Sequence, residues 1–145
     1  MTGIHVALGV ALIAVNLAAG LWGAWCWWRV RDAPGFWPLL RAGQALVVVV
    51  AADGGILVLM GRELPDLHLI YGLVPVGVSF LAEQLRLASA DTVLEQRGLE
   101  GRAAVEALPE ERQRSLVRAI VRREMGVMAT SALVVAALGA RAAGL

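Results

Sequence analysis

Residues 5–28 read HVALGVALIAVNLAAGLWGAWCWW, and this stretch decides the class of fold. It contains no Asp, Glu, Lys or Arg, and Asn16 is its one amide. A helix of about 20 apolar residues is long enough to cross a hydrocarbon core roughly 30 Å thick. Because every backbone amide in lipid must be bonded internally, the segment from about 4 to 28 is predicted to be a membrane-spanning helix.

Three further segments have the same character, at about 37–60, 67–88 and 122–140. The chain of 145 residues is 59% hydrophobic and only 17% charged, which is too apolar for an ordinary soluble domain. The alternating segments of a transmembrane β-barrel are absent. The sequence therefore predicts an all-α integral membrane four-helix bundle, one transmembrane domain over 1–145, with the lipid bilayer as its first partner.

The arginines predict the orientation of the bundle. All thirteen basic residues are arginine, and all except Arg62 and Arg141 lie in or beside the loops at about 29–36 and 89–121. Basic residues concentrate on the cytoplasmic side of membrane proteins. We therefore expect a multi-pass protein of a bacterial plasma membrane with both termini outside and a cytoplasmic helical insert over about 89–121.

The insert carries two helix signals. Thr92 and Glu95 match a capping box and Gly98 a helix stop, which predicts one short helix. After Pro109, the segment 110–123 mixes arginines with an apolar face, which predicts an interfacial helix that binds anionic lipids at the cytoplasmic face. A solvated helix at the cytoplasmic end is the alternative.

Five tryptophans cluster around the first predicted cytoplasmic loop and are expected to form an interfacial belt. A nucleic-acid stacking site is excluded, because the chain offers no soluble basic groove. The belt comprises Trp22, Trp25, Trp27, Trp28 and Trp37.

The single cysteine, Cys26, forms no disulfide within the chain and is expected to be a small apolar filler.

Residues at alternating spacings of four and three define one buried face for each span. In the first span these are His5, Gly9, Leu12, Asn16, Ala19, Gly23 and Cys26, and in the third His68, Gly72, Pro75, Ser79 and Ala82. In the second they are Arg41, Gln44, Val48, Ala51 and Gly55, and in the fourth Ala132, Ala136, Ala140 and Gly144.

Both histidines enter the membrane from the outer side, on spans expected to be diagonal partners. His5 precedes Gly9 by four residues, and His68 precedes Gly72 by the same distance, with Tyr71 between. Two facing histidines suit a b-type haem, because each neutral imidazole gives iron one axial nitrogen. Arg62 and Arg141 at the outer rim are candidates to pair with its propionates.

Other occupants stay open for the histidine pair. The same site suits a quinone, or a metal ion bound by His5 and His68, which would need a third ligand. Asp53 can supply that ligand only if its helix turns it inward. The histidines can also bind nothing, and be wetted or bonded to Glu63, Asp66 or Tyr71.

Polar residues inside the spans are costly in lipid and are expected to face protein or a ligand. Asp53 is expected to face the bundle and couple to the histidines, as a protonated acid, a histidine partner or part of a proton path. Asn16 is expected to bond across to another helix. At the inner end, side chains of the second and third spans are expected to form an ion-pair layer. These are Arg41, Gln44, Glu83 and Arg86.

Three stretches carry a resemblance: HVALGVALIAVNLAAGLWGAW at the start, RAGQALVVVVAADGGILVLMG in the second span, and LHLIYG with a following QLR. Together they resemble a group of small four-span bacterial membrane proteins of no known activity. The matching elements are His5, Asn16, the run at 19–22, Gln44, His68, Tyr71 and Gly72. The long arginine-rich connection before the fourth span departs from that group. The resemblance implies topology and no chemistry.

Two functions therefore compete. The first is an electron-transfer module that holds haem b or a quinone with His5 and His68 inside a larger membrane complex. The second is a non-catalytic structural or accessory subunit without a cofactor, whose arginine-rich insert docks a cytoplasmic partner. Other subunits of a membrane complex, or further copies in a homo-oligomer, are the expected protein partners. The motifs of soluble enzymes are missing, since there is no glycine-rich phosphate loop and no HExxH, and whether the protein is an enzyme stays open.

Overall fold

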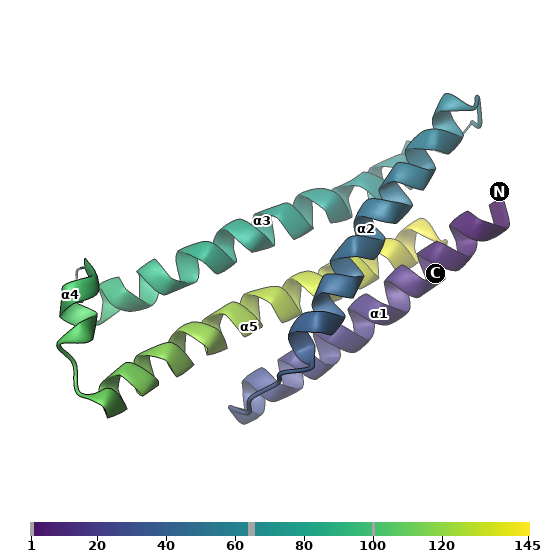
Figure 1. Cartoon of the computed structure of the whole chain (residues 1–145). Coiled ribbons are helices and arrows are strands. Elements are labelled where there is room, and N and C mark those ends of the chain that lie inside the picture. The colour runs from purple at the N-terminus through teal and green to yellow at the C-terminus, as the bar shows by residue number, and fades with distance from the viewer. Residues whose placement is uncertain (1, 64–65, 100) are drawn as a thin grey trace.

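A computed structural model describes residues 2–63, 66–99 and 101–145 and contains only helices within those ranges. Four are long, and they run along one another as an elongated bundle with the short α4 at one end and both termini at the other (Figure 1). The helices are α1 (Thr2–Arg29), α2 (Phe36–Leu59), α3 (Asp66–Gln96), α4 (Gly101–Glu106) and α5 (Glu110–Ala142).

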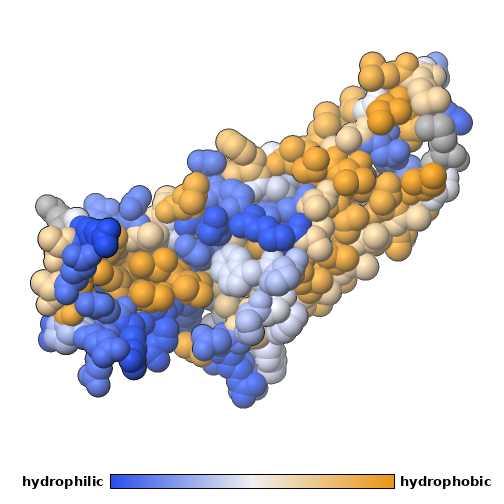
Figure 2. All heavy atoms as spheres, viewed as in Figure 1, coloured by the Kyte–Doolittle hydropathy of each residue, from blue (hydrophilic) through white to orange (hydrophobic). Residues whose placement is uncertain are grey.

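The surface of the long helices is apolar over most of its length. All four are long and apolar enough to cross a membrane, and at most 33% of any candidate window is buried inside the bundle. Exposed large side chains include Val10, Ile56, Leu73 and Phe80. Figure 2 shows hydrophobic atoms over the end that holds the termini, and hydrophilic atoms toward α4. This distribution suggests a multi-pass membrane protein, as the sequence indicates.

The connection between the third and fourth spans differs from the sequence prediction. Thr92 belongs to the last turns of α3, where its hydroxyl donates to the Ala88 carbonyl, so the capping box is not a helix start. The stop at Gly98 is present, with φ +64°. Residues 110–123 are the first turns of α5 and form no separate helix. The prediction of a separate helix over 110–123 is therefore wrong, whereas contact of this segment with anionic lipids stays a prediction.

The extension of α3 and α5 is a packed helical pair. Ser89 and Val93 of α3 and Leu116 of α5 are all buried. From Arg86 to the end of α3 the extension measures roughly 15 Å at about 1.5 Å per residue. Apolar packing along the extension therefore explains why both helices continue. The local capping pattern does not contain this information, so it predicted a helix start inside α3.

Helix α5 is the centre of the bundle. It packs against α1 on one side and α3 on the other, while α1 and α3 share almost no backbone contacts and are diagonal, as predicted. Glycines allow close approach of α1: a Cβ at Gly20 would lie 2.6 Å from the Leu133 side chain. The predicted small-residue face of α5 is buried at Ala132 and Ala136, and Gly144 is exposed beyond the helix.

The buried face of α2 is shifted from the predicted one. Val48 is 63% exposed and Gly55 is exposed, so neither packs inward. Long polar side chains at the start of α2 explain the error, because they reach sideways to α3 while their helix positions stay at the edge. The buried residues are Phe36, Leu40, Gly43, Val47 and Leu57. The predicted buried faces of α1 and α3 do face the bundle at Leu12, Asn16, Ala19, Cys26, Pro75 and Ala82.

Candidate functional site

A cavity of about 670 Å³ lies at the end of the bundle that holds the termini. Side chains from α1, α2 and α3 line it, together with the end of α5, and most of them are apolar. His5, His68 and Tyr71 are the polar side chains among the lining residues. We call this region the histidine end. A largely apolar pocket with a few convergent polar groups is typical of a small-molecule site.

His5 is held by a carboxylate. Its Nδ1 lies 2.8 Å from Oδ2 of Asp53 on α2, and both side chains are partly buried. A carboxylate oxygen accepts, so the geometry fits donation from Nδ1–H of His5 to Asp53, and in a neutral imidazole this leaves the lone pair on Nε2. Of the alternatives that the sequence left open for Asp53, the structure shows the pairing with a histidine. Asp53 lies near the shifted buried face of α2, between Val47 and Leu57.

His68 is held by the backbone at the end of α5. Its Nδ1 lies 3.0 Å from the carbonyl oxygen of Ala142, which can only accept. In a neutral imidazole this again leaves the lone pair on Nε2. The two imidazole rings lie 5.9 Å apart between centroids, with an interplanar angle of 53°. The two imidazole rings are thus neighbours, and both line the cavity.

Glycines keep space open beside the histidines. A Cβ added at Gly9, Gly55 or Gly72 would meet nothing within 4 Å. Gly9 and Gly72 are the glycines that the sequence paired with the two histidines, and both line the cavity. The cavity reaches the apolar surface of the bundle, because lining residues such as Leu59 and Leu73 are exposed.

The remaining predicted site residues separate into two groups. Tyr71 lines the cavity, whereas Arg62 and Arg141 are exposed and stand outside its lining. Within residues 2–63, 66–99 and 101–145, no three His, Cys, Asp or Glu side chains gather closely enough to hold a metal ion. The geometry thus gathers the histidines, glycines and tyrosine without the cations that propionates would require.

Asn16 has a structural role between α1 and α2. Its amide donates to the Leu12 carbonyl at 2.9 Å and to the Gly43 carbonyl at 3.3 Å. The bond to Gly43 is the predicted contact with another helix. A Cβ at Gly43 would lie 2.8 Å from the Asn16 Oδ1, so this position needs glycine.

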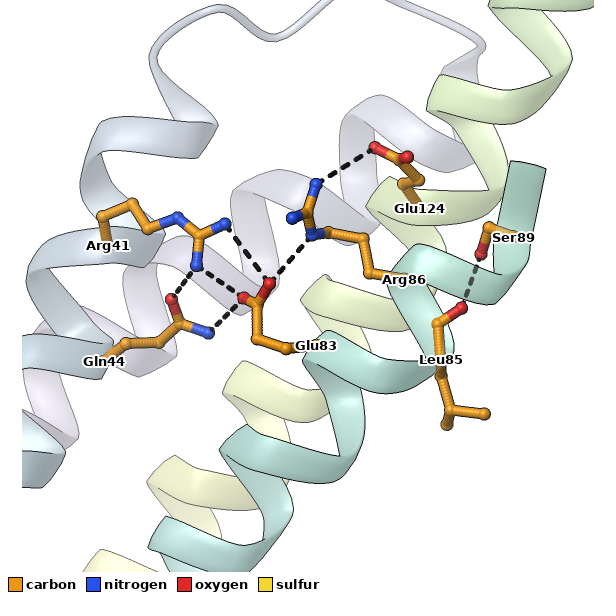
Figure 3. A network of polar contacts seen from close by, with 7 residues as sticks. All are labelled: Arg41, Gln44, Glu83, Leu85, Arg86, Ser89 and Glu124. Atoms are coloured by element: carbon orange, nitrogen blue, oxygen red, sulfur yellow. Dashed lines mark hydrogen bonds and ion pairs between the residues drawn. The ribbon is translucent and has the colours of Figure 1, made fainter. Parts of the chain in front are cut away.

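A second polar cluster lies between the histidine end and the α3–α5 extension (Figure 3). Glu83 of α3 accepts hydrogen bonds from Arg41 and Gln44 of α2 and from Arg86 of its own helix. Arg86 also approaches Glu124 of α5 at 3.8 Å. This cluster is the ion-pair layer that the sequence indicates, with Glu124 added, and it fastens α2 and α5 to α3. Gln44 belongs to it and not to the cavity.

One group that contacts a cavity residue belongs to the backbone, so no side-chain pattern in the sequence indicates it. The Ala142 carbonyl that holds His68 is one of the last carbonyls of α5, which have no partner inside their own helix. Sequence reasoning over side chains could not have found it. Its only trace in the sequence is the position of the helix end, two residues before Gly144.

Comparison with protein-family models, with curated proteins and with solved structures finds no match to this chain. The class is therefore defined by fold and site. It is a small helical protein with four candidate membrane spans and a partly open apolar cavity that carries a histidine pair. Its chemistry has to be argued from these groups alone.

Proposed function

We propose that the protein binds the ring of a membrane-soluble quinol at the histidine end and serves as a quinone-binding module of a membrane electron-transfer complex. The observation that carries the proposal is the pairing of His5 and His68 at the cavity, each with Nδ1 beside a hydrogen-bond acceptor. In the neutral imidazoles that the proposal requires, each Nε2 can then accept a hydrogen bond. The cavity volume of about 670 Å³ lies within the usual range of ligand pockets, about 300 to 1,000 Å³.

The chemistry follows from the protonation state of the two rings. A quinol hydroxyl donates, and an unprotonated Nε2 accepts. When the quinol loses two electrons and two protons, each imidazole can take one proton, and Asp53 stabilises the imidazolium of His5. The two electrons leave one after the other to a one-electron redox centre of a partner subunit, which is reoxidised between the two transfers. The apolar lining suits the prenyl tail, which enters from the lipid.

Haem b between His5 and His68 is a second candidate. A histidine that binds a metal usually donates a hydrogen bond from its other ring N–H to a carboxylate or a backbone carbonyl. The Nδ1 atoms of His5 and His68 each lie beside such an acceptor. The positions of Arg62 and Arg141 outside the cavity lining weigh against it, because haem propionates then lack cations. The quinol needs no such partner and is the better fit.

Titration of the purified, detergent-solubilised protein with a short-chain quinol tests the proposal. We expect saturable binding of one quinol per chain and no Soret band. A Soret band with sharp reduced α and β bands, lost in His5→Ala and in His68→Ala, would assign the site to haem instead. A colourless protein that binds no quinol would contradict both and leave a structural or accessory subunit.

We also propose that the histidine end faces the outside of a bacterial plasma membrane, with both termini. The support is the concentration of arginines at the opposite end. A cysteine placed at the exposed position 143 should react with an impermeant thiol reagent in intact cells, while one at exposed position 103 should not. The reverse pattern would invert the orientation.

A further inference from the structure

The junction of α1 and α5, at the end of the spans opposite the histidines, collects cations against exposed indoles. The guanidinium carbon of Arg29 lies 4.7 Å from the Trp25 ring centroid and 5.7 Å from that of Trp28. Arg122 of α5 lies 5.7 Å from the Trp27 ring centroid. We call this region, defined by Trp25, Trp27, Trp28, Arg29 and Arg122, the tryptophan end.

These two arginines differ from those of the polar cluster. Arg41 and Arg86 are neutralised by Glu83, whereas neither Arg29 nor Arg122 has an acidic partner among residues 2–63, 66–99 and 101–145. Stacking on indole holds a guanidinium in place and leaves its edge N–H groups available. Arg118 and Arg123, near Arg122 on α5, are exposed and add positive charge. Asp32, in the loop that follows α1, is the acidic residue that offsets part of it.

We propose that the tryptophan end binds the headgroup of an anionic phospholipid. A guanidinium recognises phosphate through paired N–H donors. Trp25, Trp27 and Trp28 are 49%, 43% and 68% exposed and adjoin the apolar surface of the spans, so they can lie against the acyl chains while the arginines contact the phosphate. Tryptophan is enriched at this depth of a bilayer. A free phosphate ion would make no use of the exposed indoles.

This site replaces the one expected from the sequence. An interfacial helix over 110–123 would have presented its arginines along the membrane plane, but those residues continue α5 away from the spans. Only Arg122, at the level of Trp27, meets the aromatic belt. The proposal is independent of quinol binding, because it concerns the opposite end of the bundle.

Tryptophan fluorescence reads this site directly, because all five tryptophans lie at or before residue 37, around the tryptophan end. The full chain is placed in phosphatidylcholine vesicles that contain a minor share of phosphatidylglycerol, with brominated acyl chains on one lipid or the other. We expect brominated phosphatidylglycerol to quench more than its share of the lipid predicts. The excess should fall as salt is added, because ions screen charges over about 10 Å.

Matched variants assign the excess to the two arginines. Arg29→Gln and Arg122→Gln should each lower the preference for phosphatidylglycerol about fivefold. One basic residue near an anionic membrane surface strengthens binding by a factor of about that size. Arg29→Lys and Arg122→Lys should retain most of it, which separates lost charge from misfolding. Arg112→Gln, an exposed arginine further along α5, should behave as the unmodified protein.

Three results would overturn the proposal. One is quenching by brominated phosphatidylglycerol that only matches its share of the lipid. Another is an excess that survives both Gln substitutions. The third is displacement of the excess by millimolar inorganic phosphate, which would assign the site to a free anion.

Discussion

Replacement of His5 by phenylalanine is expected to weaken quinol binding by about tenfold or more. The phenyl ring fills the space of the imidazole but cannot accept the hydroxyl hydrogen, so the hydroxyl would be buried without a partner. An unsatisfied buried polar group costs about 1 to 3 kcal/mol, and each 1.4 kcal/mol is a factor of ten in Kd. His68→Phe should have an effect of the same order, because its Nε2 is equally free.

Three further variants make this prediction specific. Asp53→Asn keeps an oxygen that can accept from Nδ1 of His5, so it should weaken binding less than Asp53→Leu, which has no acceptor. Ser79→Ala lies on the same face of α3 as His68 but outside the cavity lining and should leave the Kd unchanged. Equilibrium titration with a short-chain quinol measures all of them. Unchanged affinity in both His5→Phe and His68→Phe would contradict the assignment.

Substitution of Gly23 by leucine should produce the largest loss of stability. A Cβ at this position would overlap the Phe36 ring and lie 3.0 Å from Ala129 Cβ, so three helices meet where no side chain fits. Inserting a large side chain into a packed core typically costs 1 to 3 kcal/mol, and the better helix propensity of leucine returns only about 1. Because three helices must separate, we expect a net loss of about 2 kcal/mol.

Gly77→Leu is the control for helix propensity. Gly77 is exposed on α3, and a Cβ there would meet nothing within 4 Å. This variant should match the parent or be more stable, by up to about 1 kcal/mol, because only the helix propensity changes. Unfolding in mixed micelles by increasing dodecyl sulfate measures both free energies of unfolding. If Gly23→Leu is as stable as Gly77→Leu, the close packing of α1, α2 and α5 is not as described.

The fold was predictable where periodicity alone determines the outcome. Four long apolar segments and the spacing of small residues from Leu12 to Cys26 were enough to predict four helices and the buried face of α1. On α2 the same method selected the wrong face, because it weighted Arg41 and Gln44 as inward residues when their length lets them reach Glu83 from the edge. The spacing of residues along a helix gives the direction in which each Cβ points. The end of a long side chain can lie well away from that direction.

The candidate site shows a similar division. The depth of His5 and His68 and the glycines beside them follow from counting residues along two antiparallel pairs of helices. The contact between His68 and the Ala142 carbonyl does not, because a backbone acceptor leaves no residue pattern. The continuation of α3 and α5 beyond the predicted spans depends on packing between these two helices, where Val93 and Leu116 are both buried. Local helix signals do not encode such packing.

Nitrogen-15 NMR of histidine side chains tests the central claim most directly, since the chain contains only two histidines. Before ligand is added, both should show a protonated Nδ1 and an unprotonated Nε2. On addition of a short-chain quinol, both Nε2 signals should shift as hydrogen bonds form, while both Nδ1 nitrogens stay protonated. Nε2 signals that remain unchanged at saturating quinol would contradict the account.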